Sequence, residues 1–424
     1  MIAGLTPPDV EIRFWDDRME RIPFDEPTDL VAISVETYTA RRAYQIASEY
    51  RRRGVPVAMG GFHAMLCPNE VARYADITVV GEAEEIWHQV IDDVRHGRWQ
   101  RRYTATLRPL LGTVRPDRRI FQGKRYLPLQ LVESGRGCHF VCDFCAIQTA
   151  FGATQTRRPI DTILAEIGEI DRPKDLYFFV DDNITSNLNE AKEFYRALAP
   201  LGIRWISQAS INAAHDEEFL NLIVRSGCQG ILIGFESMDR STLKSMGKSF
   251  NTMGGGYAKA MANIRKAGLR VYGTFVFGYD HDTPDSFDAA VDFAISEKLF
   301  IGAFNHLTPF PGTEVYRKLL EQDRLTSDAW WLDPKYKYNQ IPFRPKTFSP
   351  EELQARCLDA RRRFYSWSSI MTRMREATNR SPASVLRLYF LMNMMLRREV
   401  GQRNHLPLGD AAWDGALLPA IGGA

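Results

Sequence analysis

Cys138-His-Phe-Val-Cys142-Asp-Phe-Cys145 is the stretch of this 424-residue chain that decides the expected fold. Its C-x3-C-x2-C spacing lets three thiolates bind three corners of an iron–sulfur cube, and the neighbouring sequence offers no evident fourth ligand. One iron is then open to a small molecule, as an open coordination position marks a catalytic metal site. An apolar run at residues 127–132 precedes the cysteines, which places them on a loop leaving a strand of an α/β fold.

Other uses of the three cysteines fit this spacing less well. A structural zinc site needs four ligands, and His139 stands directly beside Cys138, where it is poorly placed to be the fourth. A disulfide between two of the cysteines would leave an odd thiol. An iron–sulfur electron-transfer or scaffold protein normally completes all four cysteine ligands of its cluster. A catalytic cluster with one open iron is therefore the favoured interpretation.

The composition is that of an ordinary globular protein. Hydrophobic residues make up 45% and charged residues 25%, and 54 basic residues nearly balance 52 acidic ones. Because no acidic or basic tail stands out, the charge indicates no nucleic-acid partner. The sequence has no apolar run of about 18 residues and no signal-peptide pattern, so we expect neither a membrane span nor secretion.

The remaining cysteines indicate a compartment. Cys67, Cys228 and Cys357 are isolated in the sequence and are expected to be buried free thiols rather than parts of a disulfide framework. A reducing compartment suits both free thiols and an oxygen-sensitive cluster. We therefore expect a cytoplasmic protein.

The first part of the chain, residues 1–98, is predicted to be a small α/β domain. Its strands are predicted at residues 10–15, 30–35, 55–59 and 77–80, with a helix at 40–53. The alternation of strands and helices predicts a parallel, doubly wound sheet. The nearly continuous apolar run at 30–35 is typical of a strand buried on both faces.

An Arg-rich linker, residues 99–124, leads to a second α/β domain at residues 125–345. The strands of this domain are predicted at residues 129–134, 176–180, 204–209, 230–236, 270–278 and 303–308. Six strand–helix units cannot close an eight-stranded barrel, so we expect a partial (β/α)6 barrel with active groups at the carboxyl ends of its strands. Residues 346–424 are expected to form a helical C-terminal region, beginning with Ser349 as the N-cap.

The cysteine motif resembles that of the radical S-adenosylmethionine (SAM) superfamily, in which an aromatic residue, here Phe144, usually precedes the last cysteine. The resemblance covers roughly residues 125–345 and is supported by four further segments. They are Phe-Val-Asp-Asp-Asn at 179–183, Gly-Phe-Glu-Ser at 234–237, Phe-Gly at 277–278 and Thr-Pro-Phe-Pro-Gly-Thr at 308–313. Together they resemble the branch of the superfamily that carries an N-terminal cobalamin-binding domain.

The resemblance implies a cofactor set and a site. Cys138, Cys142 and Cys145 would hold a [4Fe-4S] cluster whose open iron binds SAM, and reduction of SAM would break a carbon–sulfur bond.

The same resemblance places further residues around SAM. The backbone at Phe144 would contact its adenine, Asp181 or Asp182 its ammonium group, and Glu236 its ribose, with Gln208 at the neighbouring strand end. The alternatives are a turn and helix N-cap for the two aspartates and a surface ion pair for Glu236.

The first domain departs from the cobalamin-binding domain of this branch in two ways. The chain begins where that domain normally has its second strand, so we expect a truncated, flavodoxin-like domain. Either Met1 is not the true start or the domain is a structural remnant. The D-x-H-x-x-G motif of some cobalamin proteins is also absent, and cobalamin binding stays an open alternative. For His63, which follows two glycines, a tight turn with a surface histidine is favoured over a ligand-binding role.

The predicted function is reductive cleavage of SAM to modify a small biosynthetic substrate, above all by methyl transfer. Transfer of the 3-amino-3-carboxypropyl group of SAM, or a cobalamin-independent radical rearrangement or oxidation, are the alternatives. Each would need a reductant such as flavodoxin or ferredoxin. The substrate itself cannot be inferred, because the same fold and cluster serve enzymes acting on very different molecules.

Overall fold

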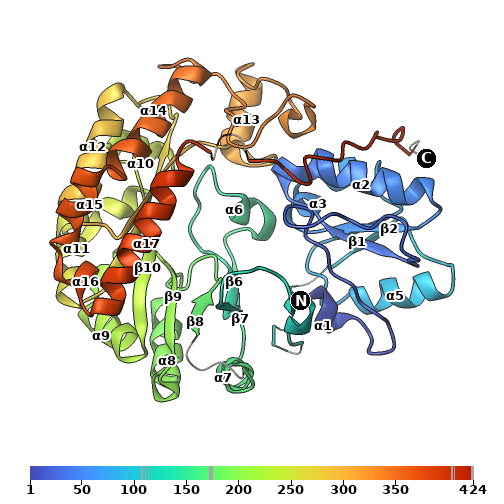
Figure 1. Cartoon of the computed structure of the whole chain (residues 1–424), viewed down its shortest axis with the longest axis horizontal. Coiled ribbons are helices and arrows are strands. Elements are labelled where there is room, and N and C mark those ends of the chain that lie inside the picture. The colour runs from blue at the N-terminus through green and yellow to red at the C-terminus, as the bar shows by residue number, and fades with distance from the viewer. Residues whose placement is uncertain are drawn as a thin grey trace.

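Two parallel β-sheets organise the protein, one in the N-terminal domain and one in the barrel, with helices following the barrel (Figure 1). The computed structural model describes residues 1–424 except 107, 110, 113, 171–174, 403, 405 and 422–424. Within the described residues, no helix is both long and apolar enough to cross a membrane.

The N-terminal sheet has four parallel strands in chain order. They are β1 (Val31–Ser34), β2 (Val57–Gly60), β3 (Ile77–Val80) and β4 (Arg102–Thr104). Helices α2 (Ala40–Arg52), α3 (Phe62–Leu66) and α4 (Pro68–Val71) share one core with one face of the sheet. Helix α5 (Trp87–Arg95) packs on the opposite face, where Ile77 and Val79 contribute to a separate core. Helices therefore cover both faces, as predicted for a doubly wound α/β domain.

Two predictions for this sheet are wrong. Residues 10–15 form no strand: the Phe14 carbonyl accepts a hydrogen bond from Lys124 Nζ at 2.8 Å, and Trp15 is exposed. The backbone N–H and C=O groups of a strand form hydrogen bonds with a neighbouring strand. In this segment, the Phe14 carbonyl forms its hydrogen bond with a lysine side chain instead. Strand β1 is also not buried on both faces, because it lies at the edge of the sheet and its residues alternate between half-buried and exposed.

The predicted linker contains part of the first sheet. Arg102–Thr104 pairs with β3 as strand β4, and buried Tyr103 donates a hydrogen bond to Asp93 at 2.8 Å. The first sheet therefore extends beyond residue 98, and the ring of Tyr103 packs in the same core as α5. Residues 107, 110 and 113 of the predicted linker lie outside the described residues.

The second sheet is the predicted partial (β/α)6 barrel. Its six parallel strands lie in the order β12-β11-β10-β9-β8-β5. These are β5 (Leu129–Val132), β8 (Leu176–Phe179), β9 (Arg204–Ala209), β10 (Cys228–Glu236), β11 (Arg270–Phe277) and β12 (Ile301–His306). The helices packed outside them are α7 (Ile160–Gly168), α8 (Leu188–Leu198), α9 (Glu217–Arg225), α10 (Arg240–Ser245), α11 (Gly256–Lys266) and α12 (Pro284–Ser296). The apolar runs of the sequence locate every one of these strands to within a few residues.

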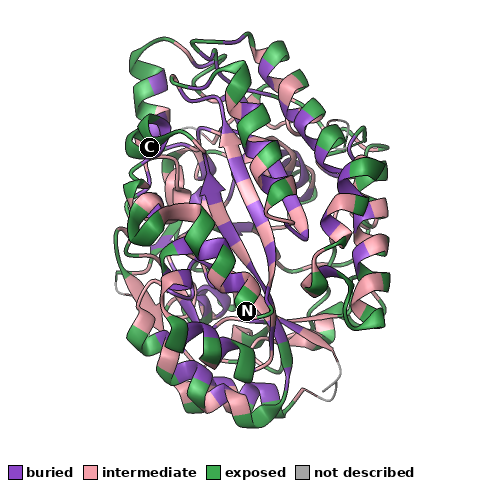
Figure 2. Cartoon of the chain, turned by 90° about the vertical axis from the view of Figure 1, so that its left-hand side faces the viewer, coloured by how far each residue is buried: buried purple, intermediate pink, exposed green. Residues whose placement is uncertain are grey.

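Burial alternates along the barrel strands, as Figure 2 shows. The helix-facing side chains are buried; Phe179 and Phe277, for example, contact rings on α8 and α12. The opposite side chains are only half-buried, and strand register aligns Gln208, Leu232 and Tyr272 in one row. Closed barrels fill this inner face with packed side chains. Here the side chains of the inner face, which we call the lumen, stay partly exposed.

The C-terminal region begins as predicted with α14 (Pro350–Phe364), whose N-cap Ser349 accepts a hydrogen bond from the Glu352 amide at 3.1 Å. Three more helices follow: α15 (Trp367–Met374), α16 (Ala377–Arg380) and α17 (Ala383–Glu399). The predicted helical C-terminal region is therefore present, and beyond its last helix the described chain is irregular. It runs back over α2, where the Arg42 guanidinium lies 4.4 Å from the Trp413 ring centroid (Figure 1). This tail binds the N-terminal domain instead of forming its own helical hydrogen bonds.

Candidate active site

The three cysteines lie on the loop between a short strand and a helix, within the connection of a two-stranded antiparallel sheet. Strand β6 (Gly135–Gly137) pairs antiparallel with β7 (Gln155–Arg157), and Cys138 follows β6 directly. Cys145 is the N-cap residue of α6 (Ala146–Phe151). Gly137 has a φ of 88°, and a Cβ there would collide with the Thr154 carbonyl oxygen, so the hairpin needs glycine next to the first cysteine.

The donor set fits a cluster with an open iron. All three thiols are free and close enough for the charges of Cys145 and Cys138 to add to the burial that raises the pKa of Cys142 to about 12. Among the described residues, no three His, Cys, Asp or Glu side chains converge on a single metal ion. A [4Fe-4S] cube does not require such convergence, because each thiolate binds a different iron. Bound iron would supply the positive charge that keeps these buried thiols deprotonated.

A segment following α10 holds the cysteine loop from the barrel side. The Met246 carbonyl accepts a hydrogen bond from the Asp143 amide at 3.1 Å. Gly247 has a φ of 75°, and a Cβ there would collide with the backbone of the loop. The rings of Phe250 and Phe140 stack with centroids 4.2 Å apart. The loop is thus fixed along its length before any cofactor binds.

Glu236 and Lys248 form an ion pair beside the cysteines, with 2.7 Å between the carboxylate and Nζ. Glu236 is 6% exposed and has a φ of 63°, a conformation that costs energy for a residue with a side chain. Its carboxylate occupies the space beside Gly234 where a Cβ would stand. Such strain at a strand end is typical of functional sites, which supports a ligand-binding role for Glu236 over a surface ion pair.

Lys248 is the main site residue that the sequence analysis missed. Burial lowers its pKa, but Glu236 and the thiols of Cys142 and Cys145 outweigh burial and raise the pKa overall. Its Nζ lies 5.9 Å from the Phe144 ring centroid. The only sequence signal was a Gly-Lys pair after a short helix, which is equally common in surface loops. In the folded chain, the charge of Lys248 acts on the thiols of Cys142 and Cys145.

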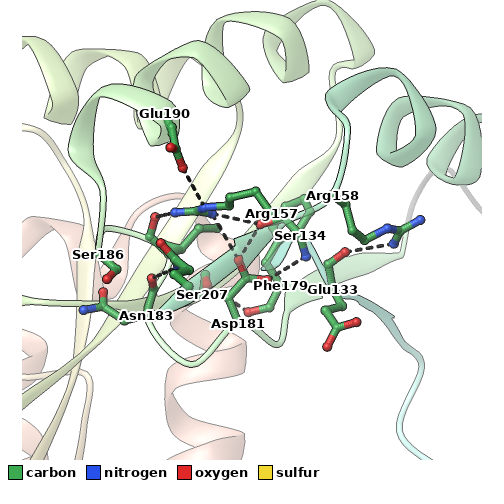
Figure 3. Close-up of polar contacts among 12 residues, drawn as sticks. Glu133, Ser134, Arg157, Arg158, Phe179, Asp181, Asn183, Ser186, Glu190 and Ser207 are labelled. Atoms are coloured by element: carbon green, nitrogen blue, oxygen red, sulfur yellow. Dashed lines mark hydrogen bonds and ion pairs between the residues drawn. The ribbon is translucent and has the colours of Figure 1, made fainter. Parts of the chain in front are cut away.

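The two aspartates after β8 reach the predicted strand end, but protein donors already bind them. Asp181 accepts hydrogen bonds from the Ser134 amide at 2.7 Å and from the Ser134 hydroxyl, and Arg157 approaches to 3.3 Å (Figure 3). Burial raises its pKa to about 6. Asp182 accepts from the Gly137 amide at 2.7 Å, and its carbonyl accepts from Gln208. Neither aspartate caps α8, since Asn187 does so.

Asp143, inside the motif, connects the loop to two further barrel elements. Its carboxylate accepts a hydrogen bond from the Tyr279 hydroxyl, just after β11, at 2.6 Å. Its carbonyl accepts from the Val315 amide at 3.0 Å, in α13 (Glu314–Glu321). The segment at 308–313 ends in Thr313, which is the N-cap residue of α13 and so helps to place the Val315 amide. The loop is therefore anchored to strand ends all across the barrel.

The corresponding strand ends of the N-terminal domain are closed by side chains. His63 is fully buried, so the prediction of a surface histidine is wrong, although Gly61 does make the predicted turn with a φ of 89°. The ring nitrogens of His63 lie 3.2 Å from Thr37 Oγ1 and 3.0 Å from Glu70 Oε1. Both nitrogens therefore have partners, and His63 does not fit the role of an axial ligand to cobalamin.

Comparisons with known proteins agree with this geometry. Residues 132–294 match the model of the radical SAM superfamily. Bacteriochlorophyllide d C-12(1)-methyltransferase of Chlorobaculum tepidum is 31% identical over 410 residues, 94% of this chain and 88% of that protein. Bacteriochlorophyllide d C-8(2)-methyltransferase of the same organism is 28% identical, over 96% of this chain and 93% of that protein.

A solved structure shares the fold. The cobalamin-dependent SAM radical enzyme OxsB aligns with a TM-score of 0.61 at 13% identity, covering 88% of this chain and 64% of that one. The chain therefore belongs to the radical SAM superfamily, in the branch with an N-terminal cobalamin-binding-like domain.

Within that family the protein is an enzyme that transfers a methyl group in a biosynthetic reaction. The cofactors of its family are a [4Fe-4S] cluster and SAM.

Proposed function

We propose that this enzyme methylates a carbon atom of a bacteriochlorophyllide-like macrocycle. The observation that carries this proposal is the lumen, whose half-buried side chains are largely apolar. Phe178 and Ile206 pair in one register row. Leu232, Tyr272 and Ile301 lie in another row, together with Gln208. An inner face with several apolar side chains and few polar ones suits a large, mostly apolar substrate. The names of the two bacteriochlorophyllide methyltransferases, similar over nearly the whole chain, supply the substrate class.

In this proposal, Cys138, Cys142 and Cys145 hold the [4Fe-4S] cluster. When bound, the cluster supplies the low-potential electron that cleaves SAM. A one-electron carrier such as flavodoxin or ferredoxin is the proposed source of that electron.

Glu236 and Lys248 are proposed to bind SAM as a pair. The carboxylate of Glu236 can accept hydrogen bonds from ribose hydroxyl groups, and Lys248 can neutralise the SAM carboxylate. Their ion pair of 2.7 Å keeps both charges stable in the buried site until SAM binds. The backbone at Phe144 is proposed to contact the adenine, while Gln208 orients the loop after β8 through the Asp182 carbonyl. Asp182 keeps one carboxylate oxygen for the SAM ammonium group.

The test uses the full-length protein, reconstituted with iron and sulfide without oxygen. It is incubated with a chemical reductant, methyl-deuterated SAM and bacteriochlorophyllide d, with and without added cobalamin. We expect a product carrying the labelled methyl group, identified by mass spectrometry. The Cys138→Ala protein is the control and should give none. Cleavage of SAM with no labelled pigment, together with methylation of a hopanoid precursor offered in parallel, would reject the proposed substrate class.

A further inference from the structure

The loop after β8 forms hydrogen bonds along the segment that carries the first cysteine. Four consecutive contacts run in the same order along both segments (Figure 3 shows the first). They join Asp181 to Ser134, Asp182 to Gly137, Asn183 to Cys138, and Ser186 to His139. Several contacts in matching order fix the relative position of two segments more firmly than one contact could, because hydrogen bonds in a network strengthen one another.

Asn183 makes the contact that reaches the cluster ligand itself. Its Nδ2 lies 3.5 Å from Cys138 Sγ and 2.7 Å from Ser210 Oγ. Its Oδ1 accepts hydrogen bonds from the amide and the hydroxyl of Thr185, at 3.1 and 2.9 Å. A flipped amide would point its NH2 group at the Thr185 amide donor, so the network fixes the N–H groups toward Cys138.

The side chain has little freedom to move away. Asn183 is 6% exposed, and Ser210 and Thr185 are themselves linked, because the Ser210 amide donates to Thr185 Oγ1 at 2.9 Å. A buried side-chain amide that leaves these partners would lose several hydrogen bonds at once. The N–H group therefore stays directed at the sulfur in the folded protein.

We propose that Asn183 is a positioning residue that donates an N–H···S hydrogen bond to the Cys138 thiolate and so raises the reduction potential of the cluster. Reduction adds one electron to the cluster, and a donor at a ligand sulfur stabilises the added negative charge. The electron comes from the one-electron carrier named above, which is oxidised by one electron, and no covalent bond forms or breaks. The inference rests on the proposed placement of the cluster on Cys138, Cys142 and Cys145.

The test is a redox titration of the reconstituted holoprotein, followed by the paramagnetic signal of the reduced cluster. Asn183→Leu removes the donor, and Asn183→Asp removes it while keeping an oxygen for the Thr185 donors. In both variants we expect a lower potential, with the reduced-to-oxidised ratio at a fixed potential falling about tenfold, which corresponds to about 59 mV for one electron. Iron and sulfide content per chain are measured alongside.

Asn263→Leu is the matched control, because Asn263, on α11, donates its side-chain amide to the Ala214 carbonyl, outside the site. Its potential should equal that of the unchanged protein. An unchanged potential in both Asn183 variants at full iron content would overturn the inference. Loss of the cluster from both Asn183 variants, with Asn263→Leu fully loaded, would support the positioning of Cys138. A fully loaded Cys138→Ala protein of normal potential would instead reject the placement of the cluster.

Discussion

The barrel and the N-terminal domain are both parallel sheets with helices outside, yet their strand ends differ. In the barrel, the strand ends bring Asp182, Glu236 and Tyr279 to one cysteine loop, and the lumen beside them is only half-buried. In the N-terminal domain, Glu70 accepts hydrogen bonds from Tyr44 at 2.8 Å and from Trp331 at 3.0 Å. One set of strand ends holds the cysteine loop beside half-buried side chains, and the other is closed by a network that includes Trp331 from outside the N-terminal domain.

The domain boundary shows the same difference. Arg136, at the barrel hairpin, lies 3.0 Å from Glu82 and 2.6 Å from Glu84, both just after β3, and 2.6 Å from Glu133. Arg108 adds a second cation to Glu82 at 2.6 Å. An unpaired buried charge is strongly destabilising, so these carboxylates require the arginines to stay in place. The ion pairs therefore join this end of the N-terminal sheet to the barrel. Similar architecture thus carries a cysteine loop in one domain and an ion-pair network to the neighbouring domain in the other.

The largest effect should come from the cluster ligands. Cys142→Ala should remove the cluster and abolish methyl transfer, because two thiolates cannot hold a cube with one open iron. Iron and sulfide analysis and SAM cleavage measure this. Cys228→Ala is the matched control: Cys228 is a buried free thiol on β10, and its loss should leave the cluster intact. A loaded, active Cys142→Ala protein would remove the basis for calling the barrel the catalytic domain.

The Glu236–Lys248 pair should produce the next largest effect. Lys248→Met should weaken SAM binding roughly 10- to 100-fold, as expected for loss of a charged hydrogen bond in a buried site. Equilibrium binding of SAM to the reconstituted protein measures it. Lys266→Met is the control and should leave the affinity for SAM unchanged. It breaks the ion pair between Lys266 and Glu217, in which both side chains are 77% exposed. Equal SAM affinity in the two variants would mean that Lys248 only supports the fold.

The attachment of the domains can be tested at Arg136. Arg136→Met leaves Glu82, Glu84 and Glu133 without their shared cation and should lower the free energy of unfolding by about 3–5 kcal/mol. Denaturant unfolding of the apoprotein measures the change. Arg119→Met is the control, since that side chain is exposed in its pair with Asp117. A negligible loss of stability would contradict the claim that these ion pairs hold the two domains together.

His63 distinguishes a closed strand end from a cobalamin site. His63→Phe should cost about 1–3 kcal/mol, because Glu70 loses a donor in a buried network. If the protein takes up added cobalamin, its absorption spectrum should be the same with either residue, since His63 does not reach a ligand. A spectrum that changes with His63→Phe would contradict the assignment of this histidine to the core.

The smallest effect is a pH dependence at Asp181. Burial raises its pKa in the folded protein to about 6, from 3.8 for the free group. The folded state then holds a proton that the unfolded state releases, so stability falls as pH rises from about 4 to 6 and is constant above that window. Asp181→Asn should remove this slope in the apoprotein, measured by denaturant unfolding at several pH values. An identical slope in both proteins would show that Asp181 does not titrate there.

Much of the barrel could be predicted from sequence. Apolar runs such as the one at Leu176–Phe179 identify a parallel strand because both the length and the flanks of the run are characteristic. The prediction failed at residues 10–15, where an alternating apolar and charged pattern has no strand to pair with. It also failed for the burial of His63, since partners such as Trp331 come from a distant part of the chain.

The sequence by itself determined the cluster motif, the six-stranded barrel and the family, because each depends on residues close together in the chain. Only the tertiary structure decided that Lys248 lies near the cysteines, that Asn183 contacts Cys138, and that His63 is buried against Glu70. The physical reason is that a hydrogen bond or ion pair depends on distance in space. Residues separated by 45 positions, as Asn183 and Cys138 are, meet only after the sheet has formed.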